Sequence, residues 1–269
     1  MFSNFFNKNS NKQVKEKIFG EYFSSKAPNN KIISFRALCL GALLLRNEFE
    51  MYKKDRINNP ILPITDDFSV KLDDWCTKEG LNDYFSNREK ELLTKPLENW
   101  TDQEIINTSW SSQALGILLW SLSYYESIPL FPKAFTLSEN LISKLHVLHD
   151  TKDFFEKARL RNVKEIRMER DNAEHWHWRS RTYSLIKQGK KAPEGLTWDK
   201  IISVSANGGY KDGSNPQPID NDFPVANKAF RDLTLHEYQL MASIIQERHF
   251  AFNWLCGYSK NWDDTPTDT

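Results

Sequence analysis

Glycine and cysteine are both scarce in this sequence. Only 10 of the 269 residues are glycine, about half of the average share, and strand-like alternation of apolar and polar residues is rare, which together favour helices. The three cysteines, Cys39, Cys76 and Cys256, are an odd number at unrelated spacings and form no C-x-x-C motif. This pattern excludes a disulfide-stapled scaffold and predicts a reducing compartment, the cytoplasm.

The chain also lacks a net charge and a long apolar run. Lys and Arg number 36, and so do Asp and Glu, so the total charge gives no bulk attraction to nucleic acid or anionic lipid. The longest apolar stretch, residues 114–122, is about half the length that spans a bilayer. The start of the chain does not have the basic and then apolar order of a signal peptide. We therefore expect no membrane partner.

What is present is helical periodicity in a chain that is 39% hydrophobic and 13% aromatic, with a mean hydropathy of −0.62. This composition is too apolar for a disordered chain and too polar for a membrane protein. The periodicity predicts a disordered tail over residues 1–12 and one helical domain over 13–265. The predicted fold is all-α, an irregular bundle around a buried central helix at about 102–125, with further helices at 13–24, 32–54, 66–79, 82–94, 163–187 and 235–256, and one after Ser138.

Helix-capping and loop-forming residues support several of these boundaries. Thr101 with Glu104 and Thr234 with Glu237 have the spacing of capping boxes, in which side chains at a helix start satisfy free backbone N–H groups. Residues 207–224 contain three each of Asn, Asp, Gly and Pro, 12 of 18 positions, and are predicted to form a loop. Whether this loop has a function is left open.

The last predicted helix places a cation on its apolar face. At 100° per residue, Arg248 lies about 40° from Ile244, inside the buried arc that includes Leu240, and Glu247 lies on the edge of that arc. An unpaired buried guanidinium is costly, so Arg248 must find acceptors. The expected partners are Asp263 or Asp264, just beyond the helix, or Glu174. The alternative is that Arg248 holds an anion at the floor of a pocket.

A second polar pattern runs along the helix at 163–187. Arg170, Glu174, His177 and Arg181 are spaced by four, three and four residues, so they form one stripe. Small residues beside the stripe would let another helix approach closely and partly bury it. Three chemical interpretations compete for this stripe.

The first interpretation is a metal site, because Glu174 and His177 form an E-x-x-H motif. A di-iron bundle needs a second such motif, and the sequence has none, so we expect neither a metal nor a cofactor. The second is an enzyme in which Glu174 and His177 act as an acid–base pair and Arg170, Arg181 and Arg248 hold an anionic substrate. No nucleophile motif or phosphate-binding loop supports it.

The third interpretation is nucleic acid binding. Residues 157–191 contain 11 Lys or Arg against four Asp or Glu, with Trp176 and Trp178 interleaved, and aromatic side chains can stack on bases. The acidic residues punctuate this run, and several of the arginines lie on or near the predicted core side. A solvated or internally paired helix accounts for the pattern better, and we do not expect a nucleic acid partner.

Three blocks of the sequence resemble one protein family. They are the Trp-rich helix at 107–122, the segment His177-Trp-Arg-Ser-Arg181, and the tail from Gln246 to Asp264 with its E-R-x-x-A-x-N-W-L-x-G pattern followed by W-D-D. The chain resembles the bacterial family named domain of unknown function 4272 over about residues 32–265. The resemblance implies a bacterial helical protein and brings no activity, cofactor or substrate. The positions that match its motifs are Trp110, Trp178, Arg179, Arg181, Glu247, Arg248, Asn253, Trp254, Trp262, Asp263 and Asp264.

The tail motif is interpreted as a structural clasp. In this hypothesis Gly257 reverses the chain, Trp262 folds back on the last helix, and Asp263 or Asp264 pairs with Arg248 or with an arginine of the 170–181 stripe, beside Glu247. The leading functional prediction is a non-catalytic protein-interaction or regulatory module with a protein partner, and the alternative is the hydrolase-like or transferase-like enzyme described above. An enzyme should gather the stripe and Arg248 at an open cavity, whereas a binding module should bury those pairs. The sequence leaves the oligomeric state open.

Overall fold

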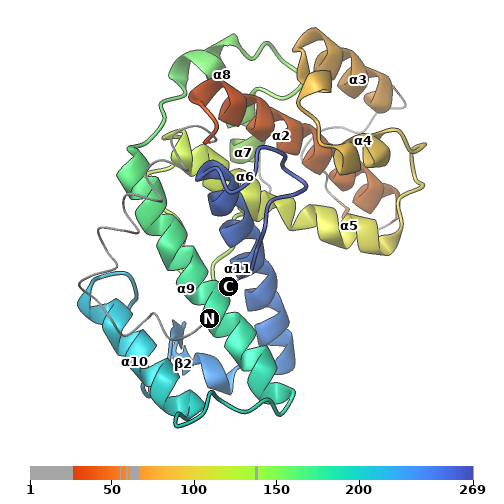
Figure 1. Ribbon diagram of the computed structural model, residues 1–269. Helices are drawn as coiled ribbons and strands as arrows, with labels where there is room; N and C mark the ends of the chain where they lie inside the picture. Colours follow the sequence, from red (N-terminus) through yellow and green to blue (C-terminus); the bar gives the residue numbers. More distant parts are fainter. Residues whose placement is uncertain (1–26, 55, 59, 61–66, 137–138, 269) are drawn as a thin grey trace.

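The computed structural model describes residues 27–54, 56–58, 60, 67–136 and 139–268. Within these residues the chain is mostly helical, so the predicted all-α class is confirmed (Figure 1). The described strands are only two residues long, Pro224–Val225 (β1) and Lys228–Ala229 (β2), and they pair antiparallel. The predicted tail at 1–12 and helix at 13–24 lie outside the described residues.

The long helices begin and end within two residues of their predicted positions. In chain order the helices are α2 (Asn30–Lys53), α3 (Phe68–Lys78), α4 (Asn87–Leu93), α5 (Asp102–Ser109), α6 (Ser111–Ser121), α7 (Glu139–Leu145), α8 (Lys152–Lys157), α9 (Val163–Lys187), α10 (Trp198–Lys211) and α11 (Leu235–Leu255), with short 3₁₀ turns at Leu81–Asp83 and Phe230–Asp232. Both predicted capping boxes form, at the starts of α5 and α11. Helices α8 and α10 were not predicted.

The predicted central helix at 102–125 is wrong in its length, because the chain forms two helices there. The break falls at Trp110, next to Ser109, whose hydroxyl donates to the carbonyl of Ile106 at 2.7 Å. Helix α6 then ends at Ser121, four residues early, because Ser123 adopts a left-handed backbone with φ of 66°. The break lets the two helices pack against different parts of the protein. Ile105 of α5 packs with Trp100 in a small separate cluster, whereas the apolar residues of α6 pack in the main core.

The predicted loop at 207–224 also begins too early. Helix α10 continues to Lys211, so Gly208 and Gly209 are helical. A glycine at position 209 allows close approach, since a Cβ there would lie 2.4 Å from the side-chain nitrogen of Asn215. Glycine in a helix costs only about 1 kcal/mol relative to alanine, and tertiary contacts can outweigh that cost.

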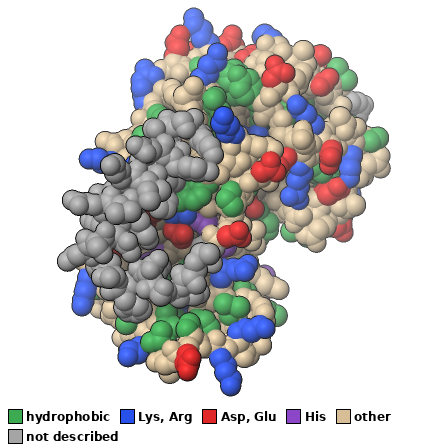
Figure 2. Space-filling model, viewed as in Figure 1, with side chains coloured by type: hydrophobic (Ala, Val, Ile, Leu, Met, Phe, Trp, Pro, Cys, Tyr) green, Lys and Arg blue, Asp and Glu red, His purple; other side chains and the backbone are tan. Residues whose placement is uncertain are grey.

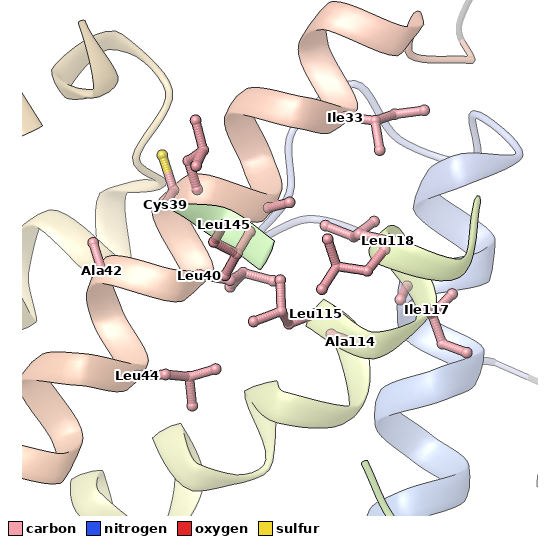
Figure 3. Close-up of a cluster of buried hydrophobic side chains, with 14 of the residues drawn as sticks. Ile33, Cys39, Leu40, Ala42, Leu44, Ala114, Leu115, Ile117, Leu118 and Leu145 are labelled. Atoms are coloured by element: carbon pink, nitrogen blue, oxygen red, sulfur yellow. The ribbon is translucent and has the colours of Figure 1, made fainter. Parts of the chain in front are cut away.

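The main core lies between α2, α6 and α11, with α7 closing one side. Leucine side chains of α2 and α6 interdigitate there with Leu145 of α7 (Figure 3). Every residue from Ser112 to Ser121 is buried, as the apolar sequence of this helix predicts. At about 1.5–3 kcal/mol for each large apolar side chain, this burial is the main stabilising contribution. Gly116 sits against the ring of Phe135, where a Cβ would lie 2.2 Å from the nearest ring atom.

A second, smaller core fills the end of the molecule that carries α10 and the β1–β2 hairpin. It contains Trp176 and Tyr183 of α9, Phe223 and Phe230 of the following segments, and Met241 and Ile245 of α11. Helices α9 and α11 run side by side from the main bundle to this lobe (Figure 1). Leu240, predicted in the buried arc of α11, is instead 38% exposed, because Met241 and Ile245 face the second core on that turn. The α9–α11 pair therefore links the two cores and carries most of the predicted site residues.

Candidate functional site

The polar stripe of α9 lies against α11. The two helices are antiparallel, because Arg170 contacts Asn253 near one end and Tyr183 stacks on Tyr238 near the other, with ring centroids 4.3 Å apart. The small residues Ala173 and Ser180 are buried in between, which permits a close approach of the two backbones. Arg170 and His177 are consequently buried, at 8% and 6% exposure.

A chain of hydrogen bonds starts at Arg170. Its Nε donates to Oδ1 of Asn253 at 2.8 Å, which fixes the orientation of the amide. The amide nitrogen of Asn253 then donates to the carbonyl of Pro266 at 2.8 Å and faces Nε2 of His249 at 3.1 Å. Since Nε2 accepts this bond, the proton of neutral His249 must reside on Nδ1. Nδ1 of His249 is buried and has no hydrogen-bond partner among the described residues.

His249 stacks on His177, with ring centroids 4.8 Å apart. Burial lowers the pKa of His177 to about 4, helped by the nearby charge of Arg181 and opposed by that of Asp268. Burial likewise lowers the pKa of His249 to about 3, together with the charges of His177 and Arg170. Both imidazoles are therefore neutral at pH 7, because a second charge in this dry contact would be unfavourable.

Glu174 is joined to Arg170 within the stripe. Nη1 of Arg170 donates to Oε2 of Glu174 at 2.6 Å, an i,i+4 pair, and approaches Asp171 at 3.3 Å. The guanidinium of Arg170 also lies over the ring of Tyr258, 4.5 Å from its centroid. No hydrogen bond between Glu174 and His177, the predicted acid–base pair, occurs among the described residues. The stripe therefore places these two residues on one face without joining them.

Arg248 is buried, as the helical periodicity predicts, but the predicted carboxylate partners are wrong. Nη1 donates to the carbonyl of Pro129 at 2.8 Å and Nη2 to that of Lys133 at 2.6 Å, while Nε and Nη2 each lie 3.3 Å from Oε1 of Gln113. The guanidinium also stacks over Phe131, 4.8 Å from its centroid. These acceptors are neutral, so burial lowers the pKa of Arg248 to about 10.

The tail folds back as the clasp hypothesis expects, but it is held by other partners. Trp262 is 9% exposed and packs edge-on against Trp254 of α11 at 5.1 Å. Asp263 accepts from the backbone N–H of Arg88 at 3.1 Å, and Asp264 from the side chain of Asn261 at 2.7 Å. The predicted pairing of these aspartates with Arg248 or with the stripe is therefore wrong: Asp263 ties the tail to α4, and Asp264 bonds within the tail.

Glu247 lies beside this anchor and forms no hydrogen bond or ion pair within the described residues. Its side chain is partly buried. Burial raises the pKa of its carboxyl group to about 7, and the charge of Arg88 opposes this shift. The charge acting on Glu247 is thus that of Arg88 on α4, and Glu247 forms no bond with Arg248.

A cleft of about 350 Å³ opens between α9 and α11 on the side of the second core. Of the predicted site residues, it brings together His177 and Arg181. Arg170, Glu174 and Arg248 do not line it. The cleft is bordered by His177, Ser180, Arg181, Ser184, Leu185, Gln188, Tyr238, Ala242, Gln246 and Thr267.

Two polar contacts were missed by the sequence reasoning. Arg179 and Asp222 are both fully buried and form a bidentate pair, with two nitrogen–oxygen distances of 2.7 Å. His175 turns away from His177, as their spacing predicts, and contacts the hydroxyl of Ser205 and the amide of Asn215. Their partners come from α10 and the following loop, so local spacing cannot reveal them. Only the family resemblance at Arg179 pointed to one of these residues.

The part of the chain that the structure describes contains no cluster of three or more His, Cys, Asp or Glu side chains able to hold a metal ion. Among the described helices, none combines the length and apolar character that crossing a membrane requires.

Comparison with known proteins gives one family. The model of the family described as "Domain of unknown function (DUF4272)" matches residues 26–204, well over half of the chain, which confirms the resemblance found in the sequence. The match ends before the tail block at 246–264. No curated protein and no solved structure matches the chain.

Proposed function

The chain belongs to the DUF4272 family, and from this premise we propose that it is a non-catalytic protein-interaction or regulatory module in the bacterial cytoplasm. One observation carries the proposal, namely how the charges divide between the interior and the surface. The buried arginines are bonded inside the protein, whereas a group of exposed cations at the end of α9 has no ion-pair partner among the described residues.

The bonds that the buried arginines form inside the protein argue against an anion-binding active site. Arg170 is occupied by Asn253 and Glu174, and Arg248 by Gln113 and two backbone carbonyls. A substrate would have to replace these bonds, at a cost of roughly 1–3 kcal/mol for each buried polar group left unpaired. Of the three proposed anion-binding arginines, Arg181 alone lines the cleft.

The exposed cations at the end of α9 support a partner with an acidic surface. Between residues 181 and 200 the chain has five Lys or Arg against two Asp or Glu, within a protein of zero net charge. Lys187, Lys190, Lys191 and Lys200 are exposed; we call these four residues the basic end. Figure 2 shows Lys and Arg side chains spread around the lobe that contains it. Unpaired surface cations of this kind steer association with an oppositely charged partner.

The three buried cysteines, all unpaired thiols, agree with a reducing compartment such as the cytoplasm. A nucleic acid is the other polyanion that the basic end could attract. The flanking Glu194 and Asp199, both exposed, would face the phosphates and weaken that binding. An acidic protein surface, with charges at discrete positions, fits the mixed pattern better.

The test is affinity capture from a lysate of the native host, comparing the wild-type chain with two charge-reversal variants. The variant K187E/K190E alters the basic end. Its matched control, K78E/K90E, reverses two exposed lysines on α3 and α4. We expect a stoichiometric protein partner that is retained by wild type and control and lost by K187E/K190E. Capture of no protein, of nucleic acid instead, or of a partner that tolerates K187E/K190E would contradict the proposal.

A further inference from the structure

We propose that the cleft between α9 and α11 binds a small oxyanion, the carboxylate or phosphate group of a metabolite-sized ligand, with Arg181 as its cationic anchor. This site goes beyond the partner surface of the proposed function, and it is separate from the basic end. The basic end lies at the C-terminus of α9 and beyond it, whereas the cleft lies between the two helices.

Small side chains create the cleft. Ser180 and Ser184 of α9 face Ala242 of α11 across it, so the two helices leave a gap that larger residues would fill. A volume of about 350 Å³ is at the lower end of known ligand pockets, which span roughly 300–1,000 Å³. At about 30 Å³ for each water molecule in the liquid, the space accommodates a ligand of about a dozen heavy atoms.

The charges of the wall select an anion. Arg181 is the one cation among the bordering residues, and none of them is a carboxylate. Arg181 is exposed and forms no ion pair with a described residue, so its planar fork is free to bind an oxyanion with two hydrogen bonds. The charge of Asp268 acts on His177 in this wall, but Asp268 lies on the exposed tail, where water screens its repulsion of an incoming anion.

The remaining wall offers hydrogen bonds to the body of the ligand. Gln188 donates its amide hydrogen to the hydroxyl of Ser184 at 2.9 Å, which leaves the hydroxyl hydrogen of Ser184 free to point into the cleft. Gln246 provides a further amide from α11. Behind this wall, His177 stacks on His249, whose Nδ1–H is buried without an acceptor. The interior is thus rich in donors and poor in negative charge, which favours an anion.

The test is calorimetric titration of the full chain with two probes, inorganic phosphate and malonate. We expect saturable binding of at least one probe, and the stronger one identifies the source of the oxyanion as phosphate or carboxylate. R181Q should weaken binding tenfold or more, since it removes the charged bidentate contact. The matched control is K164Q, which removes an exposed cation at the other end of α9 and should leave binding unchanged.

A second variant tests the location without changing the charge. A242L fills the cleft from α11 and should abolish binding, while the urea unfolding midpoint stays close to that of the wild type. The proposal is overturned if neither probe saturates, if R181Q and K164Q weaken binding equally, or if folded A242L binds as the wild type does. Because none of these readouts involves a protein partner, they are independent of the test of the basic end.

Discussion

The substitution D222A should be among the most destabilising single changes in the second core. The carboxylate of Asp222 is fully buried and accepts two hydrogen bonds from Arg179, one from its own neighbour Phe223 at 2.7 Å, and one from the backbone N–H of Arg231 at 3.0 Å. It thereby ties the loop after α10 to the middle of α9. Alanine would leave the guanidinium of Arg179 buried without a counter-charge.

The size of the effect follows from these contacts. Breaking one side of a buried ion pair costs about 3–5 kcal/mol, because the remaining charge is uncompensated. Nη1 of Arg179 already lacks a hydrogen bond, so the pair is imperfectly satisfied and the lower half of that range applies. Two backbone N–H groups lose their acceptor as well, at roughly 1 kcal/mol each. Together these contributions lead us to expect the free energy of unfolding to fall by about 5 kcal/mol or slightly more for D222A, and by less for D222N, which retains an acceptor oxygen.

The assay is urea denaturation followed by circular dichroism and tryptophan fluorescence. The matched control is D199A, which removes an acidic partner of the same Arg231, 3.7 Å away and 87% exposed. An exposed pair of this kind contributes at most about 1 kcal/mol. A loss below 1 kcal/mol for D222A, or equal losses for D222A and D199A, would refute the argument that burial of this pair determines its strength.

Three further predictions concern other parts of the fold. G116A should lower the free energy of unfolding by about 1–3 kcal/mol, because the new methyl group clashes with the ring of Phe135. G208A lies at a helical position with open space around it and should raise the free energy of unfolding by up to about 1 kcal/mol. Chemical denaturation of both variants measures whether the two effects have opposite signs. N253A should destabilise the chain by about 2 kcal/mol and speed proteolysis of the tail, because the side chain of Asn253 holds the tail through its hydrogen bond to the carbonyl of Pro266. An unchanged cleavage rate would contradict the role of this bond. Burial raises the pKa of Glu247 to about 7, so the folded state binds more protons than the unfolded state between about pH 4.5 and 7, and the contribution of this group to stability is lost as pH rises. E247Q should therefore be more stable than wild type at pH 8, on the order of 1 kcal/mol, and should show no such gain at pH 4. Thermal unfolding at both pH values measures this difference.

The parts of the fold that local sequence determines could be predicted well. Helix α9 follows from periodicity, and α11 from periodicity with its Thr234–Glu237 capping box, because each signal lies within a few residues of what it specifies. The two-helix break at Trp110 could not be predicted, since it depends on which core each half joins. Helix α10 was missed because its two glycines disfavour a helix locally, and Asn215 packs against one of them from the next loop.

The candidate site shows the same division. Periodicity places Arg248 on the buried face, but its acceptors are a glutamine and two backbone carbonyls of a distant loop, and no sequence pattern marks a carbonyl as an acceptor. The pairing of Arg170 with Glu174 follows from their i,i+4 spacing. The stacking of His177 on His249 depends on how α9 and α11 align, which is a tertiary property.

The most direct test of the central claim, that the basic end is the partner surface, is hydrogen–deuterium exchange of the chain alone and in complex with the captured partner. We expect slowed exchange to be concentrated in peptides covering residues 181–204, and to disappear when the partner is mixed with K187E/K190E. Slowed exchange confined to α3 and α4, or none at the end of α9 while the partner is bound, would contradict the account.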